Sequence, residues 1–228
     1  MLHLKIIVVN PQGKFIIMST KNNITYSPLF RGNSILTDKD KQYGCFRPLL
    51  SRIADQFEDM TIRHNKVFFM RYDVRFPADT PTAMDNSTFC SFQADFVKQL
   101  TRQGLDPHYV VVREQSREKH QHYHGILLLD GNKTQNIYGH IQTAETIWRR
   151  KNNLPEGTGL IDACTTSRDG TPQINGVMLR KDDPDYETKK ADCFRRASYL
   201  AKVNTKANTP EGQRQLFASR IQPKQVKK

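Results

Sequence analysis

The stretch Tyr109–Asp130, with the sequence YVVVREQSREKHQHYHGILLLD, decides the fold of this chain. Its two ends are apolar and β-branched and its middle is polar, which is the pattern of two antiparallel strands joined by a loop. In such a hairpin Glu114 lies directly across from His122 and diagonally from His124. The two histidines share a face because side chains alternate along a strand. One carboxylate and two imidazoles are therefore expected to converge on one spot.

This group of side chains predicts a site for a divalent metal ion. Imidazole and carboxylate ligands suit Mg²⁺ or Mn²⁺ and leave positions open for substrate oxygens. Zinc more often takes a fourth protein ligand or thiolates. His120 has the same parity as the histidine pair and is an alternative to Glu114 as third ligand. The competing interpretation is that His122 and His124 are ordinary hydrogen-bonded strand residues.

Charge points to a polyanionic partner. The chain has 228 residues, of which 37% are hydrophobic, enough to bury a core in one domain of good size. Lys and Arg number 35 against 23 Asp and Glu, which gives a net charge of +12. An excess of this size favours nucleic acid first and an anionic membrane second.

Cysteine usage and hydropathy indicate an intracellular protein. The four cysteines are scattered without a CxxC spacing, which argues against a zinc ribbon or a disulfide framework and fits reduced thiols. No apolar run approaches the roughly 18 residues that a membrane span needs. We therefore expect a cytoplasmic location and no membrane partner.

The pattern along the chain predicts an α+β fold with a central antiparallel sheet flanked by helices. We expect three parts: an N-terminal hairpin and irregular arm (1–46), a main domain (47–206) and a basic C-terminal tail (207–228). The expected strands are 4–9, 15–19, 67–76, 109–114, 122–129, 159–164 and 174–179, the last two lying around a turn at 169–170. The expected helices are 47–62, one that begins at 85–87 and ends at 104, one around 137–148, and one from about 185 to 206.

The last of these helices carries a candidate nucleophile. Arg195, Tyr199, Lys202 and Lys206 recur at helical spacing and form one stripe. Neighbouring positive charge favours the phenolate of a tyrosine, whose reference pKa is about 10. The same cations would bind a phosphodiester. The alternative is a surface tyrosine among solvated lysines.

Taken together, these motifs resemble the HUH endonuclease superfamily, and most closely the inovirus and prophage replication-protein family. The shared pattern is His122-Tyr123-His124, an acidic ligand eight residues earlier at Glu114, and a downstream Tyr199-x-x-Lys202. The resemblance covers about residues 47–206. The runs that carry it are RYDVRFP at 71–77, VRE at 112–114, HYHG at 122–125 and SYLAK at 198–202.

The resemblance implies an HUH nickase-like sheet, a ferredoxin-like variant, that bears the metal and faces the tyrosine. Tyr199 is then the nucleophile that nicks single-stranded DNA at a replication origin and stays joined to it as a 5′-phosphotyrosine, starting rolling-circle replication of a phage, prophage or mobile element. Lys202 assists the chemistry. No helicase segment is visible, so a host helicase and polymerase are expected partners. The candidate DNA contacts are Arg71, Arg75, Arg195 and Lys206.

The chain departs from two-tyrosine members of the superfamily, because positions 195 and 203 are Arg and Val. Strand closure would then need a second subunit or another tyrosine such as Tyr186. A different class of function is also open, namely a non-catalytic nucleic-acid-binding regulator on the same fold. The two classes differ in whether Glu114, the two histidines and Tyr199 need to converge.

Overall fold

A computed structural model describes residues 5–9, 15–19, 23–78, 82–115, 120–167, 169–203, 209–210 and 212–221, the first two ranges as backbone alone. Its centre is a six-stranded sheet in the order β10-β7-β9-β8-β12, with β11 also pairing with β7, and all of these pairs are antiparallel. The predicted α+β class with a central antiparallel sheet is confirmed. The strands are β7 (Lys66–Arg75), β8 (His108–Glu114), β9 (His122–Asp130), β10 (Ile161–Asp162), β11 (Val177–Arg180) and β12 (Leu216–Ala218).

The register of β8 and β9 is the one that the sequence predicts, with Glu114 opposite His122. On its other side β9 pairs with β7, which places Gly125 opposite Tyr72. A Cβ atom at Gly125 would lie 2.6 Å from the Tyr72 ring, so the aromatic side chain fills the space above the glycine. Glycine is required here because the ring packs directly on the backbone.

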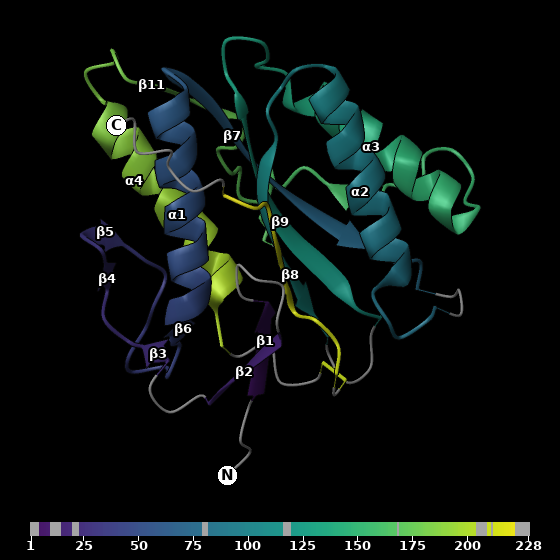
Figure 1. Cartoon of the computed structure of the whole chain (residues 1–228), viewed down its shortest axis with the longest axis horizontal. Coiled ribbons are helices and arrows are strands. Elements are labelled where there is room, and N and C mark those ends of the chain that lie inside the picture. Colours follow the sequence, from purple (N-terminus) through teal and green to yellow (C-terminus); the bar gives the residue numbers. More distant parts are fainter. Residues whose placement is uncertain are drawn as a thin grey trace, which may run out of the picture.

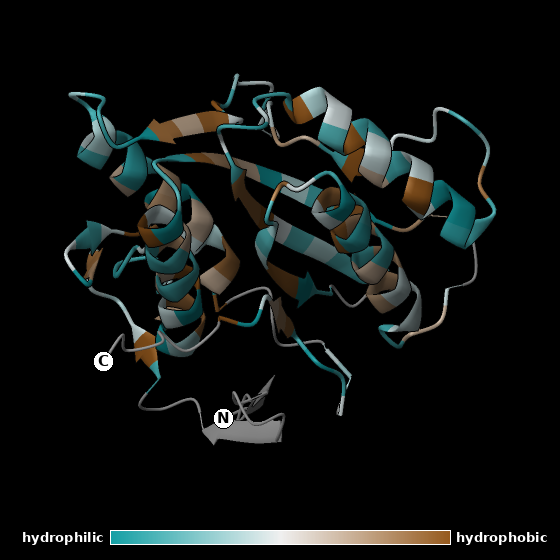
Figure 2. Ribbon diagram, turned by 45° about the horizontal axis from the view of Figure 1, so that its top comes forward, coloured by the Kyte–Doolittle hydropathy of each residue, from teal (hydrophilic) through white to brown (hydrophobic). Residues whose placement is uncertain are grey.

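Helices cover both faces of the sheet (Figure 1). On one face lie α1 (Arg47–Arg63) and α4 (Tyr186–Ala197), and on the other lie α2 (Ser87–Arg102) and α3 (Ile137–Asn152). Each helix shows both polar and apolar stretches along its length in Figure 2, as expected for helices with one buried side. Buried residues on α1 are Leu49, Leu50, Ile53, Phe57 and Met60, and those on α2 include Phe89, Phe92, Phe96 and Leu100.

The helix predicted for 185–206 is wrong at its C-terminal end. The α-helix stops at Ala197, a single 3₁₀ turn (η1) spans Ser198–Ala201, and Lys202 then pairs with Cys45 of the N-terminal arm. Helical spacing alone could not reveal this end, because it depends on a segment far away in the sequence. Lys206 lies outside the described residues.

Two further predictions concern the edges of the sheet. Strands β10 and β11 overlap the predicted segments 159–164 and 174–179, and the chain turns at 169–170 with an antiparallel bridge between Thr166 and Pro172, but β10 and β11 each pair with β7. Part of the predicted polar tail, Leu216–Ala218, forms strand β12 beside β8. Leu216 and Phe217 are buried there, which explains why so short an apolar run leaves solvent.

The N-terminal arm consists of short antiparallel pairs. The predicted hairpin is present as β1 (Lys5–Val9) paired with β2 (Phe15–Ser19), while its turn lies outside the described residues. Next come β3 (Ile24–Thr25) paired with β6 (Cys45–Phe46), and β4 (Leu29–Phe30) paired with β5 (Asn33–Ser34). Ile35, Cys45 and Phe46 enter the same hydrophobic core as α1 and α4, so this part of the arm packs on the sheet domain.

No helix among the described residues combines the length and apolar character that crossing a membrane requires.

Candidate active site

Three side chains from β8 and β9 meet at one end of the sheet. Oε2 of Glu114 lies 3.1 Å from Nε2 of His124 and 3.5 Å from Nε2 of His122. One ligand atom from each of the three residues falls within 4.8 Å of the others. The predicted convergence is therefore present. His120 is not part of this group, because its Nε2 contacts the carbonyl oxygen of Ala78 at 3.2 Å.

The donor atoms are spaced suitably for a divalent cation. Two ligands at right angles, each about 2.1 Å from an ion of the size of Mg²⁺, lie about 3 Å apart, close to the observed separations of 3.1 and 3.5 Å. The side chains of Glu114 and His124 are only 3% and 8% exposed, whereas that of His122 is 30% exposed. The group is therefore open to solvent on the His122 side, where a substrate could enter.

A further carboxylate, that of Asp73 on β7, contacts His124 at the ring nitrogen that faces away from Glu114. Its Oδ1 lies 2.7 Å from Nδ1 of His124, its direct partner across the strands. Burial works against the charged carboxylate of Asp73, but His124 and Arg71 outweigh this and lower its pKa. Burial likewise lowers the pKa of His124, and the two carboxylates of Asp73 and Glu114 more than reverse that, so this pKa is raised. The carboxylate orients the ring and leaves Nε2 facing the site.

Tyr199, in the turn η1, packs directly against this group. Its ring stands edge-on to the His124 ring, with centroids 5.3 Å apart at an angle of 83°. The guanidinium carbon of Arg71 lies 4.9 Å from the centre of the tyrosine ring, and the Lys202 ammonium lies 4.5 Å from it. The predicted nucleophile therefore sits between two cations and beside the histidine pair.

The expectation of a favoured phenolate is not met. Burial raises the pKa of Tyr199, and the negative charge of Glu114 raises it further, which outweighs the lowering effect of Arg71. The sequence showed the cations of the helix but not the carboxylate that the sheet brings next to the tyrosine. Burial also lowers the pKa of Lys202.

The N-terminal arm holds the turn that carries Tyr199. The buried hydroxyl of Ser198 accepts a hydrogen bond from the backbone N–H of Leu36 at 2.9 Å and donates one to the carbonyl of Arg195 at 2.6 Å. On the other side of the tyrosine, the N–H of Val203 donates to the carbonyl of Gly44 at 3.0 Å. The position of the tyrosine thus depends on contacts with residues 36 and 44–45.

The four candidate DNA contacts have different locations. Arg71 is mostly buried beside Tyr199, with its side chain 13% exposed. Arg75 lies directly opposite His122 and is exposed, with Nη2 3.5 Å from Asp162. Arg195 is exposed on α4. Lys206 lies outside the described residues.

Two residues near the site were missed in the sequence. The Arg196 guanidinium donates to the carbonyl of Cys164 at 3.4 Å, and burial together with the charge of Arg71 lowers its pKa. Asn175 accepts a hydrogen bond from the N–H of Arg71 at 2.8 Å and donates one to the Arg71 carbonyl at 2.9 Å. The Asn175 side chain thereby makes the two backbone hydrogen bonds that a neighbouring strand would make to β7, at a point between the stretches of β7 that pair with β10 and β11. No local motif identifies either role.

Tyr186, the other tyrosine considered as a nucleophile, begins α4. The twelve residues of α4 rise about 18 Å, so this tyrosine lies at the far end of the helix from η1. Its ring contacts Lys190, whose ammonium is 5.3 Å from the ring centre. Tyr186 is therefore poorly placed to share the site with Tyr199.

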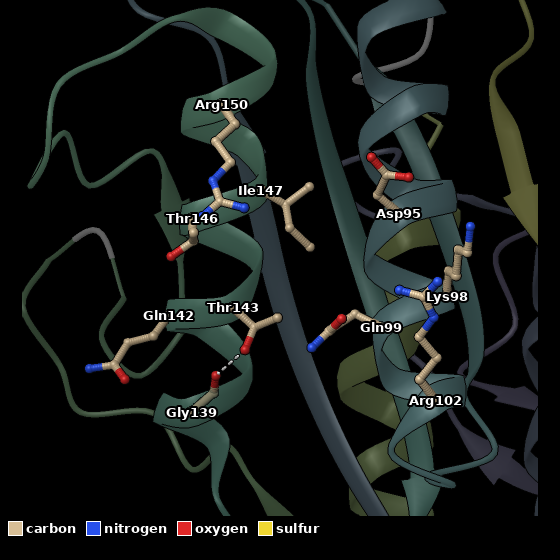
Figure 3. A pocket seen from close by; sticks show the side chains of 10 residues that line it. All are labelled: Asp95, Lys98, Gln99, Arg102, Gly139, Gln142, Thr143, Thr146, Ile147 and Arg150. Carbon is tan, nitrogen blue, oxygen red and sulfur yellow. Dashed lines mark hydrogen bonds between the residues drawn. The ribbon is translucent and has the colours of Figure 1, made fainter.

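A groove of about 520 Å³ lies between α2 and α3, on the opposite face of the sheet (Figure 3). Its walls are polar and charged and contain none of the residues described above. Asp95 at its rim pairs with Lys151 at 2.6 Å. The lining residues are Asp95, Lys98, Gln99, Arg102, Gly139, Gln142, Thr143, Thr146, Ile147 and Arg150.

Comparison with known protein families assigns this chain to one of them. Residues 26–217 match the model of the YagK/YfjJ C-terminal domain. The match covers the sheet apart from Ala218 of β12, the four α-helices of the described residues and the candidate site, and the chain belongs to this family. No curated protein and no solved structure matches it.

Proposed function

We propose that this protein is a metal-dependent endonuclease of the HUH type that nicks single-stranded DNA and becomes joined to it through Tyr199. The observation that carries the proposal is the convergence of Glu114, His122 and His124 with Tyr199, from two strands and a separate turn, on one face of the sheet. A protein that only bound nucleic acid would need basic surface but not this combination of ligands and nucleophile.

Residues around the tyrosine fit the binding of one phosphodiester. Arg71 and Lys202 lie on the Tyr199 ring and would hold the phosphate oxygens beside it. The phenolic oxygen attacks phosphorus, the bond to the 3′ oxygen breaks, the phenol loses its proton, and the leaving oxygen gains one. The products are a 5′-phosphotyrosine and a free 3′-hydroxyl.

Glu114, His122 and His124 would hold Mg²⁺ or Mn²⁺, and Asp73 would orient His124. When bound, such an ion supplies Lewis-acid stabilisation of charge on the phosphate oxygens. Glu114 is the residue whose charge most directly opposes ionisation of the tyrosine, so pairing that charge with a cation also favours the nucleophile.

In its biological setting, the enzyme would act at a replication origin of a phage, prophage or mobile element, with the 3′-hydroxyl priming synthesis by a host polymerase and a host helicase unwinding the duplex. Strand closure would then be carried out with the tyrosine of a second subunit, since Tyr186 lies about 18 Å along α4 from the turn that carries Tyr199.

The decisive experiment detects the covalent product. The purified protein is incubated with end-labelled single-stranded DNA and Mn²⁺, and adducts are separated under denaturing conditions. We expect an adduct and a nick with the wild type, and neither with Tyr199→Phe, which removes only the phenolic oxygen. Tyr186→Phe is the matched control and should keep both. If the wild type forms no adduct with any divalent metal, the protein is a binding regulator and the proposal is wrong.

A further inference from the structure

An exposed aromatic ring lies next to the proposed nucleophile. Tyr43, in the N-terminal arm, keeps 40% of its surface exposed, so its ring is accessible to a ligand. Its position is fixed by the backbone, because its N–H donates to the carbonyl of Asp38 at 2.7 Å and its carbonyl accepts from the N–H of Asp38 at 3.0 Å. The backbone that carries the ring is therefore held in place without the tyrosine hydroxyl.

Lys202 links this ring to the site. Its ammonium lies 6.0 Å from the centre of the Tyr43 ring and 4.5 Å from the centre of the Tyr199 ring. The spacing is set by the main chain, since Lys202 pairs with Cys45 and the N–H of Val203 donates to Gly44. The centres of the two tyrosine rings are thus separated by no more than the sum of those two distances, and one cation is near both.

An unpaired nucleotide is the ligand that suits this arrangement. Its base can stack on an exposed tyrosine ring while its phosphate binds the neighbouring ammonium, and a base inside a duplex cannot do so. Phosphates follow one another about every 3.4 Å along a strand in a duplex and lie farther apart in an extended one, so the upper limit on the separation of the rings corresponds to at most roughly three nucleotides.

We propose that Tyr43 is a stacking platform for an unpaired base of single-stranded DNA, close to the phosphate that Tyr199 faces. The inference rests on the proposed function for the identity of that phosphate, but the stacking itself can be measured without any cleavage. It assigns to the N-terminal arm a direct part in selecting single-stranded over double-stranded substrate.

The test compares two strands that differ only in having bases. Binding of oligothymidylate, and of an abasic strand with the same number of phosphates, is measured by fluorescence anisotropy in EDTA, where no nicking is expected. Tyr43→Leu should weaken binding of oligothymidylate by about five- to hundredfold, and should leave binding of the abasic strand unchanged. Tyr43→Phe retains the ring and should bind both strands like the wild type.

Tyr138→Leu is the matched control, because Tyr138 is 63% exposed on α3 and lies on the opposite side of the sheet. It should alter neither affinity. The stacking platform is refuted if Tyr43→Leu weakens the binding of both strands equally or the binding of neither. It is also refuted if Tyr43→Phe, with the melting temperature of the wild type, binds oligothymidylate as weakly as Tyr43→Leu does. Failure of the nickase proposal is separate, since it shows as a missing adduct while the difference between the two strands remains.

Discussion

Oδ1 of Asp73 lies 2.7 Å from Nδ1 of His124, and the two residues are direct partners across β7 and β9. Both side chains are at least nine-tenths buried, so water cannot replace either partner. A carboxylate in this position fixes which imidazole nitrogen of His124 faces Glu114 and the candidate metal site. It also makes that nitrogen a better electron-pair donor.

We therefore predict that Asp73→Asn weakens Mn²⁺ binding by about 10- to 100-fold. The asparagine keeps the shape of the side chain and removes the charge. Titration calorimetry with Mn²⁺ measures the effect in the absence of DNA. Asp162→Asn is the control, because Asp162 lies near the same edge of the sheet but contacts Arg75 rather than a histidine. Equal affinities for Asp73→Asn and the wild type would show that this carboxylate does not support the site.

The two histidines should differ in their effect on stability. His122 is 30% exposed at the rim, so His122→Ala should abolish nicking while the melting temperature stays close to that of the wild type. His124→Ala should abolish nicking too, and in addition cost about 2–4 kcal/mol of unfolding free energy, because two buried carboxylates, Asp73 and Glu114, lose their nearest positively charged neighbour. Urea denaturation of both variants measures the difference. The same stability loss in both would contradict the assigned burial.

Ser198→Ala tests whether the N-terminal arm positions the nucleophile. The change removes the acceptor of the Leu36 N–H and a donor to the Arg195 carbonyl, and should cost about 1–2 kcal/mol of stability. We expect the nicking rate to fall further than the affinity for single-stranded DNA, since Tyr199 shifts while the basic residues remain. Ser87→Ala, which loses an exposed bond to Asp85 on the other face, is the control. An unchanged nicking rate in Ser198→Ala would show that the N-terminal arm does not position Tyr199 for the reaction.

The convergence of the candidate metal ligands could be predicted from sequence because their geometry is local. Glu114 and His122 are separated by one loop, and strand alternation with a hairpin register is enough to bring them together. Asp73 could not be predicted in the same way, because its position opposite His124 depends on how β7 pairs with a strand some fifty residues later. The alternation of Arg71 and Asp73 along a half-buried strand was visible, but not the residues that face them.

The surroundings of Tyr199 could be predicted only in part. Helical spacing predicts Lys202 beside it, and the Lys202 ammonium lies 4.5 Å from the ring centre. That spacing predicts neither Arg71 of the sheet, 4.9 Å from the ring centre, nor the end of the helix at Ala197. The ending depends on hydrogen bonds to the arm, which no local signal near the tyrosine reveals. Strands β10 and β11 overlap the predicted segments 159–164 and 174–179, whereas β12 was not predicted, because three residues carry too little periodicity to identify a strand.

Binding of single-stranded DNA should weaken steeply with salt, because phosphate contacts release counterions. Arg75 is exposed directly opposite His122, so Arg75→Ala should reduce the slope of log affinity against log salt concentration by about 0.7, the value for one phosphate contact on a single strand. Arg31→Ala, which removes an arginine paired with Asp55, is the control and should leave the slope unchanged. An affinity independent of salt would argue against phosphate contacts altogether.

His108, at the opposite end of the sheet from the metal ligands, should make stability depend on pH. It is 5% exposed, and its Nδ1 lies 2.7 Å from Oε1 of Gln56. The Gln56 amide nitrogen donates to the carbonyl of Ser219 at 2.7 Å, which fixes its oxygen toward the imidazole and makes Nδ1 the donor. Burial lowers the pKa of His108, and the nearby charges of Asp106 and Asp59 only partly oppose this.

The unfolded chain therefore takes up a proton on His108 near the ordinary value of 6.5, while the folded protein takes it up only at lower pH. The contribution of neutral, buried His108 to the free energy of unfolding is complete above that pH and is lost as the pH falls below it. For one proton, the free energy of unfolding changes by at most about 1.4 kcal/mol per pH unit. His108→Gln should lower this slope, measured by urea denaturation at about pH 7.5, 6.5 and 5.5. Burial also lowers the pKa of His140, so part of the slope should remain in the variant. Identical slopes in the variant and the wild type would mean that His108 is protonated equally in the folded and unfolded states.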